Sequence, residues 1–203
     1  MFYYLEGTVT IIEPNIAVID CGGAGYAVHT TANTLSYLET GKKARLYTYC
    51  SIKEDAFDIY GFKEMAEKRC FEMLVSVSGV GPKAAQSILS SNTPEGLAMA
   101  IVTENEKALS AAPGIGKRIA QRIILELKDK IAKETTTLKA EGFVPQSTAS
   151  AGGKLNEVTA ALTVLGFGPA EITAALRSVD MDSLSVEEII KAVLKGSLKQ
   201  GTI

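Results

Sequence analysis

The residues with the clearest chemical signature are two short segments that combine glycine, one apolar residue and positive charge. The first, residues 78–83, reads SGVGPK, and the second, residues 113–118, reads PGIGKR. The longer stretches around them, 74–88 and 109–123, share the pattern L-x4-G-[VI]-G-x-[KR]-x-A-Q-x-I at a constant offset of 35 positions. Such self-similarity indicates one small structural unit that occurs twice.

A glycine on either side of an apolar residue suits a tight turn between two helices, because glycine adopts positive φ without steric cost. The bare outer face of such a turn exposes backbone amides next to the N-terminus of the second helix, where partial positive charge favours a phosphate. Such a turn binds the DNA backbone without reading bases. The expected phosphate-binding residues lie in or just after the two turns: Gly79, Val80, Gly81, Lys83, Gly114, Ile115, Gly116, Lys117, Arg118 and Arg122.

Two other interpretations fit these segments less well. A single copy also fits an ordinary helix-turn-helix corner with glycine at the turn, but two copies in register favour the phosphate-binding interpretation. A Walker A loop is excluded, because Ala111 stands at its first glycine position and Arg118 follows Lys117 in place of Ser or Thr. Val80 and Ile115 are expected to fix the two turns in the core.

A pair of carboxylates, Glu54 and Asp55, lies between two strand-like runs and is expected at the tip of a β-hairpin. An acidic pair in a turn is usually a solvated loop. A nuclease would need a cluster of carboxylates to hold metal ions, and this pair has no obvious third ligand. The pair alone therefore indicates no catalytic site.

The overall charge opposes a general nucleic-acid binder. The 203 residues carry 21 Lys and Arg against 23 Asp and Glu, for a net charge of −2. The charge is uneven, however, since residues 1–63 carry −2, residues 64–133 carry +2 and residues 134–203 carry −2. The positive segment bears both glycine turns, which favours selective binding of a DNA shape with a strong dependence on salt.

Other totals exclude several kinds of site. A single histidine, His29, rules out a multi-histidine metal centre, and three scattered cysteines without CxxC spacing fit a reducing cytosol. No run of about 18 apolar residues predicts a membrane span, and the first residues lack the pattern of a secretory signal. We therefore expect a cytoplasmic protein with no metal and no cofactor.

The elements that must position these residues form a multidomain α+β chain. Residues 1–63 read as about five short strands, which suits a small barrel or sandwich; the OB-fold is a natural candidate among several five-stranded folds. Residues 64–133 carry helical spacing and predict an all-α domain around the two turns. Residues 134–153 are small and polar and predict a flexible linker, and residues 154–203 predict three short helices.

The two turns look like tandem helix-hairpin-helix motifs, and the whole chain resembles the RuvA family of Holliday-junction-binding proteins. The resemblance is carried by GGAGY at 22–26, by KEDA at 53–56 with YGF at 60–62, and by the two turns. Two departures from the family pattern are mild: Lys53 stands where Arg is expected and Arg118 where Lys is expected, and both keep the charge.

The resemblance implies an OB-fold barrel, a tandem helix-hairpin-helix domain and a C-terminal domain similar to the three-helix ubiquitin-associated fold. It implies a homotetramer, or an octamer on DNA, that holds a four-way junction open and square. Residues 154–203 would contact a RuvB-type hexameric AAA+ ATPase, which would hydrolyse ATP in place of this chain. A junction-resolving endonuclease is a further expected partner. Glu54 and Asp55 match the family's acidic pin, which would face phosphates at the junction centre.

Two other function classes fit parts of the chain. A helix-hairpin-helix glycosylase or structure-specific nuclease would share the turns, but the larger catalytic domain of the first and the carboxylate cluster of the second are not evident. A single-strand binder built on the barrel would stack bases on Tyr47 and Tyr49, which alternate along one strand-like run.

Overall fold

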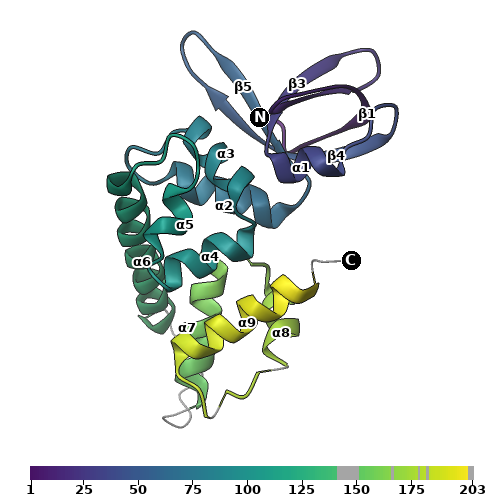
Figure 1. Ribbon diagram of the computed structural model, residues 1–203. Coiled ribbons are helices and arrows are strands. Elements are labelled where there is room, and N and C mark those ends of the chain that lie inside the picture. The colour runs from purple at the N-terminus through teal and green to yellow at the C-terminus, as the bar shows by residue number, and fades with distance from the viewer. Residues whose placement is uncertain (141–150, 166, 178, 182, 201–203) are drawn as a thin grey trace.

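The computed structural model describes residues 1–140, 151–165, 167–177, 179–181 and 183–200 (Figure 1). A barrel of strands, a central group of helices and a C-terminal group of helices follow one another along the chain. Among the described residues, no helix combines the length and the apolar character that crossing a membrane requires.

Five strands and one helix form the N-terminal barrel: β1 (Tyr4–Glu13), β2 (Ile16–Asp20), β3 (Gly25–Thr30), α1 (Ala32–Tyr37), β4 (Lys43–Ile52) and β5 (Phe57–Phe62). The order around the closed barrel is β1-β2-β3-β5-β4. Strands β3 and β5 pair in parallel, and the other neighbours pair antiparallel. The predicted five strands are confirmed, and the closed barrel matches the OB-fold candidate.

Two local features let the barrel close. Strand β1 pairs with β4 along its first half and with β2 along its second, and a register shift between Val9 and Ile11 lies within the second pairing. A Cβ on Gly61 would lie 2.4 Å from Val28 Cγ1, so glycine is needed where β3 and β5 approach. Buried apolar side chains from all five strands fill the interior: Leu5, Val9, Ala17, Ile19, Val28, Leu46 and Ile59.

Five helices form the central domain: α2 (Met65–Val75), α3 (Pro82–Ser91), α4 (Pro94–Val102), α5 (Glu106–Ser110) and α6 (Lys117–Ala140). Side chains define where two of them begin. Thr93 Oγ1 accepts from the Gly96 N–H at 3.1 Å before α4, and Asn105 Oδ1 accepts from the Ala108 N–H at 3.2 Å before α5. Helical periodicity predicts all five.

The barrel and the central helices share a core. Phe71 of α2 packs against Tyr49, Tyr60 and Phe62 of β4 and β5, with ring centroids 5.2, 5.1 and 4.9 Å away. Tyr49 is therefore a packing residue of this joint. Next to Phe71 along α2, Cys70 is fully buried, and burial raises the pKa of its thiol.

Three helices form the C-terminal group: α7 (Ala151–Val164), α8 (Pro169–Leu176) and α9 (Val186–Gln200). Helix α7 packs on α6 and α9 packs on α4 (Figure 1). Ser185 caps α9, since its Oγ accepts from the Glu188 N–H at 3.3 Å. Leu165 and Phe167 are buried in a core that is continuous with that of the central helices. The C-terminal helices are thus seated directly on the central domain.

The predicted linker, residues 134–153, is helical at both of its ends. Helix α6 continues to Ala140, and α7 begins at Ala151. Residues 134–140 contain three threonines and also Glu, Leu, Lys and Ala, which favour a helix. Residues 141–150, where the linker composition is most biased, lie outside the described residues, so linker flexibility and the division into domains stay predictions.

Candidate nucleic-acid interface

Two turns connect the helix pairs of the central domain. Hairpin 1 (residues 76–81) joins α2 to α3, and hairpin 2 (residues 111–116) joins α5 to α6. Gly79 and Gly114 have φ of +85° and +81°, in the region that favours glycine. In each turn the amide after this glycine donates to the carbonyl three residues earlier, at 3.0 Å in hairpin 1 and 3.1 Å in hairpin 2. The two copies therefore share one backbone geometry, as the sequence repeat predicts.

In each turn the apolar residue is buried and the glycines on either side of it are exposed. Val80 and Ile115 are only 4% and 5% exposed, so they hold the turns in the core, as predicted. The glycines are exposed, and a Cβ on Gly81, Gly114 or Gly116 would meet nothing within 4 Å. An anion has room to approach the backbone of both turns. The predicted basic side chains are also exposed: Lys83, Lys117, Arg118 and Arg122.

Each hairpin is braced by the second helix of the other. Ser87 of α3 donates from Oγ to the Pro113 carbonyl in hairpin 2 at 2.8 Å. Arg122 of α6, which the repeat aligns with Ser87, reaches hairpin 1, where its Nη1 lies 4.0 Å from the position of a Cβ on Gly79. The two hairpins thus form one unit, and Arg122 lies beside the hairpin that precedes its own.

Two of the basic side chains already have carboxylate partners. Arg122 Nε donates to Glu126 Oε1 at 2.8 Å, and Lys117 Nζ lies 4.0 Å from Glu106 Oε2. Lys83 and Arg118 have no ion-pair partner in the part of the chain that the structure describes. These two side chains are therefore the ones most available to an incoming phosphate.

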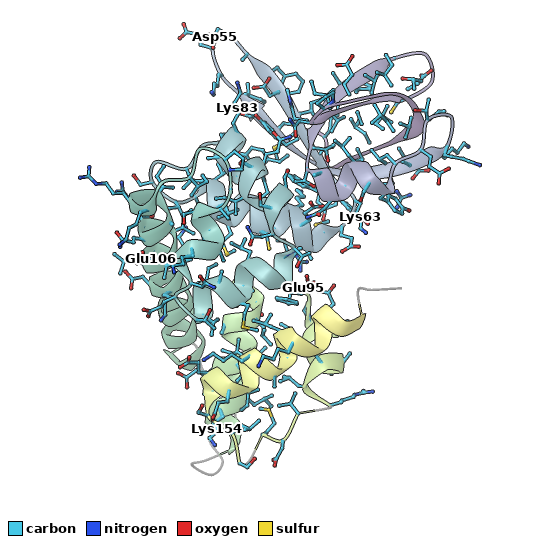
Figure 2. All side chains as sticks on the ribbon, in the orientation of Figure 1. Asp55, Lys63, Lys83, Glu95, Glu106 and Lys154 are labelled. Carbon is cyan, nitrogen blue, oxygen red and sulfur yellow. The ribbon has the colours of Figure 1, made fainter. Side chains whose placement is uncertain are left out.

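The acidic pair lies at the free end of the β4–β5 hairpin, as predicted. Ile52 and Phe57 form the last cross-strand pair, and a backbone hydrogen bond of 2.8 Å across residues 53–56 closes the turn. Glu54 and Asp55 are exposed there, and Figure 2 shows Asp55 at the end that projects away from the barrel. Within the described chain, no hydrogen bond or ion pair joins this acidic tip to either hairpin.

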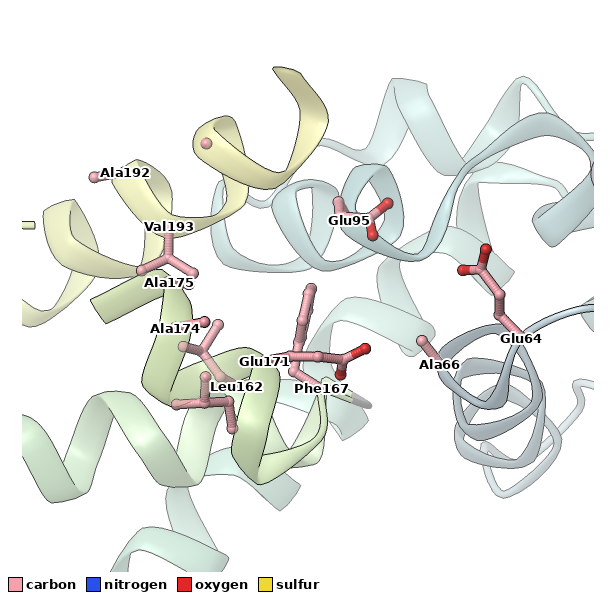
Figure 3. Close-up of a pocket in the computed structure, with 12 residues that line it drawn as sticks. Glu64, Ala66, Glu95, Leu162, Phe167, Glu171, Ala174, Ala175, Ala192 and Val193 are labelled. Carbon is pink, nitrogen blue, oxygen red and sulfur yellow. The ribbon is translucent and has the colours of Figure 1, made fainter. Parts of the chain in front are cut away.

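A cavity of about 410 Å³ lies between the central and C-terminal helices. Figure 3 shows Glu64 and Glu95 on the central side and Glu171 and Phe167 on the C-terminal side. Three carboxylates would repel a phosphate, so this cavity does not suit the DNA backbone. The described residues also contain no group of three or more His, Cys, Asp or Glu side chains that is placed to hold a metal ion.

Comparison with known proteins bears on all three parts of the chain. The model of the RuvA N terminal domain matches residues 1–61, that of the SAM-like helix-hairpin-helix tandem matches residues 71–129, and that of the RuvA C-terminal domain matches residues 153–198. The Holliday junction branch migration complex subunit RuvA of Acetivibrio thermocellus is 44% identical over 200 residues, which cover 97% of this chain and 98% of that protein. The chain belongs to the RuvA family. Proteins of the same description from Ruminiclostridium cellulolyticum and Streptomyces coelicolor are each 40% identical, over 96% and 98% of this chain and 99% and 97% of their own lengths.

In this RuvA-family chain, a buried polar network connects α2, the helix before hairpin 1, to the barrel. Glu67 of α2 is 4% exposed, and its carboxylate accepts from the hydroxyls of Thr31 and Thr34, the second at 2.7 Å. Thr34 Oγ1 in turn accepts from the Lys63 N–H at 3.0 Å. Burial raises the pKa of the Glu67 carboxyl, against the lowering effect of the two hydroxyls.

Helix α3 makes further polar contacts with the barrel. Gln86 Nε2 donates to the Thr30 carbonyl at 2.5 Å, and Asn33 Nδ2 donates to the Leu89 carbonyl at 2.7 Å. Together with Phe71, these bonds fix hairpin 1 relative to the barrel that carries the acidic tip. The hairpins and the acidic tip therefore belong to parts of the chain that pack directly against each other.

The structure adds two residues that sequence reasoning missed, Glu67 and Glu126. The repeat aligns them with Val102 and Ser91, so neither belongs to the repeated pattern. The i, i+4 spacing of Arg122 and Glu126 was the one sequence signal for that ion pair. No comparable signal marks Glu67, because its threonine partners lie 36 and 33 positions away in the sequence.

Proposed function

We propose that this chain is a non-catalytic DNA-binding subunit that holds a four-way (Holliday) junction open and square during recombination and repair. The observation that carries the proposal is the pair of hairpins, which share one backbone geometry and are each contacted by the second helix of the other. The relatives that match nearly the full chain are named as subunits of a Holliday junction branch migration complex. Together these favour a protein that binds DNA by shape.

The hairpins would bind phosphates of the DNA backbone. The exposed glycines of each turn admit a phosphate to the backbone amides at the N-termini of α3 and α6. Lys83 and Arg118, which occupy equivalent positions in the repeat, would add charge to hairpins 1 and 2. Neither contact involves a base edge, so junctions of different sequence should bind alike.

The acidic tip would act as a pin at the centre of the junction. A fourfold ring of subunits would bring Glu54 and Asp55 of every copy close to the crossover phosphates, where like charges repel. Exposed apolar side chains beside the tip support a ring, since Phe2, Ile52 and Phe57 are 38%, 69% and 53% exposed and a neighbouring copy would cover them. We therefore propose a homotetramer that separates strands at the crossover, and two such rings would enclose the DNA as an octamer.

The motor activity would belong to a partner. No Walker A pattern is present in the sequence, and relatives are subunits of a branch migration complex, so a RuvB-type AAA+ ATPase would supply ATP hydrolysis. Residues 154–203, which include most of the C-terminal helices, are the proposed contact with this motor. A junction-resolving endonuclease would act on the same open junction.

Neutralising the pin tests this function. The double variant E54Q/D55N should bind a plain duplex about two- to fivefold more tightly than the wild type, because two carboxylates no longer repel the backbone. The variant E13Q/E39Q, which removes two exposed charges outside the β4–β5 hairpin, is the control. Unchanged affinity of E54Q/D55N for both duplex and junction would contradict the pin, and Mg²⁺-dependent strand cleavage by the pure wild type would favour a nuclease instead.

A further inference from the structure

Helix α6 places a row of alternating charges against hairpin 1. Arg122, Glu126 and Lys130 follow one another at spacings of four, so they share one face of the helix. Arg122 Nη1 lies 4.0 Å from the position of a Cβ on Gly79, and Lys130 Nζ donates to Ser76 Oγ at 2.5 Å. Glu126 lies between these two cations.

The Glu126 carboxylate accepts hydrogen bonds from two donors of the kinds that bind phosphate. Its Oε2 accepts from the Ser78 backbone N–H at 3.2 Å, and its Oε1 accepts from Arg122 Nε at 2.8 Å. Backbone amides of a glycine turn and a guanidinium are among the donors that a helix-hairpin-helix would offer to DNA. These hydrogen bonds and the neighbouring cations hold the pKa of the Glu126 carboxyl below its usual range, so it is ionised at neutral pH.

Hairpin 2 has no equivalent of this contact. The residue that aligns with Ser78 is Pro113, which has no backbone N–H to donate. The residue that aligns with Glu126 is Ser91, which carries no charge. The internal anion is therefore a property of hairpin 1 alone and does not follow from the repeat.

We propose that Glu126 is an internal competitor for DNA phosphate at hairpin 1 and thereby sets specificity for the junction. The proposal rests on the function proposed above and concerns the same surface. A plain duplex, which engages only some of the hairpins, must displace the carboxylate from Arg122 with few other contacts to offset the loss. A junction that engages the hairpins of several subunits at once offsets the same loss more easily.

The test compares Glu126→Gln with Glu104→Gln in the full chain. Glutamine at 126 keeps an oxygen that can accept from the Ser78 amide but removes the charge that competes with phosphate. Glu104, which precedes α5, pairs with Lys128 of α6 at 2.5 Å and lies outside both hairpins. The E104Q variant therefore makes the same change in net charge away from hairpin 1. Fluorescence anisotropy with a labelled duplex should show about two- to fivefold tighter binding for E126Q than for E104Q. The ratio of junction to duplex affinity should fall accordingly.

Two further measurements separate competition from structural support. E126Q should lower the melting temperature of the free protein slightly while it tightens duplex binding. If Glu126 only stabilised hairpin 1, the substitution would lower the melting temperature and also weaken duplex binding. In an Arg122→Ala background E126Q should increase duplex affinity less, because the guanidinium for which carboxylate and phosphate compete is absent. Equal duplex affinities of E126Q and E104Q, or weaker binding by E126Q, would overturn the proposal. If the wild type binds junction and duplex with equal affinity, the proposed function fails. The comparison of E126Q with E104Q on duplex still decides the role of Glu126.

Discussion

The two hairpins have one backbone geometry and two different electrostatic settings. Gly79 and Gly114 adopt nearly the same φ, and Val80 and Ile115 are buried to the same degree. Around hairpin 1, however, a carboxylate from α6 occupies a turn amide, whereas hairpin 2 has a proline at that position.

The same two hairpins are also attached to different parts of the molecule. Hairpin 1 is tied to the barrel through Glu67, and hairpin 2 continues into α6, on which the C-terminal helix α7 packs. The repeated positions thus determine the turn, and the unrepeated positions determine what charge and which neighbour each turn has. One motif can in this way occur twice in a chain with different surroundings.

The largest expected effect tests whether the two turns are equally supported by the core. Ile115→Ala should reduce the free energy of unfolding by about 2–5 kcal/mol, and Val80→Ala by about 2 kcal/mol, because each removes buried methyl groups. Urea unfolding followed by circular dichroism measures both. A loss below about 0.5 kcal/mol at either position would show that the turn is not held by that side chain.

A smaller effect tests whether the two hairpins contribute equally to DNA binding. Lys83→Ala and Arg118→Ala should each weaken junction binding about tenfold, since a hydrogen bond to a charged group contributes about 1.5–3 kcal/mol. Each should also reduce the slope of log affinity against log salt by about 1. Lys107→Ala removes an exposed charge of α5 outside both turns and is the control. A tenfold loss for one variant and none for the other would break the equivalence.

The smallest effect concerns the attachment of hairpin 1 alone. The pKa of the Glu67 carboxyl is raised in the folded state above its unfolded value near 4.5, so the native state binds the proton more tightly. Its contribution to stability is therefore present at low pH and declines as pH rises through the folded pKa. The free energy of unfolding of the wild type, relative to Glu67→Gln, should fall as pH rises above about 4.5.

Urea unfolding at a series of pH values measures this difference. Glu39→Gln, which removes an exposed carboxylate between α1 and β4, is the control, and its difference from the wild type should change less with pH than that of Glu67→Gln. If the free energies of unfolding of Glu67→Gln and the wild type differ by the same amount at all pH values, burial does not raise the pKa of Glu67.

Much of this architecture could be predicted from sequence because it depends on local patterns. Alternation and turn residues predict the five strands, and helical periodicity with the repeat predicts both hairpins and the burial of Val80 and Ile115. The acidic tip follows from Glu54 and Asp55 lying between two strand-like runs.

The contacts between elements could not be predicted in the same way. Glu67 reads as an ordinary polar position of α2 until α1 brings two threonine hydroxyls to it. Arg122 reads as part of hairpin 2 until the packing of α6 places it at hairpin 1. The helical ends of residues 134–153 were also missed, because a composition that suggests a linker does not exclude helix where Glu, Leu and Lys recur.

We propose above that the chain binds DNA by shape through its hairpins. Competition binding of the full chain to a labelled four-way junction, with unlabelled junction, duplex and single strand as competitors at matched salt, tests it most directly. We expect the unlabelled junction to compete at least tenfold better than duplex or single strand, irrespective of base sequence. Equal competition by all three DNAs would contradict binding by DNA shape.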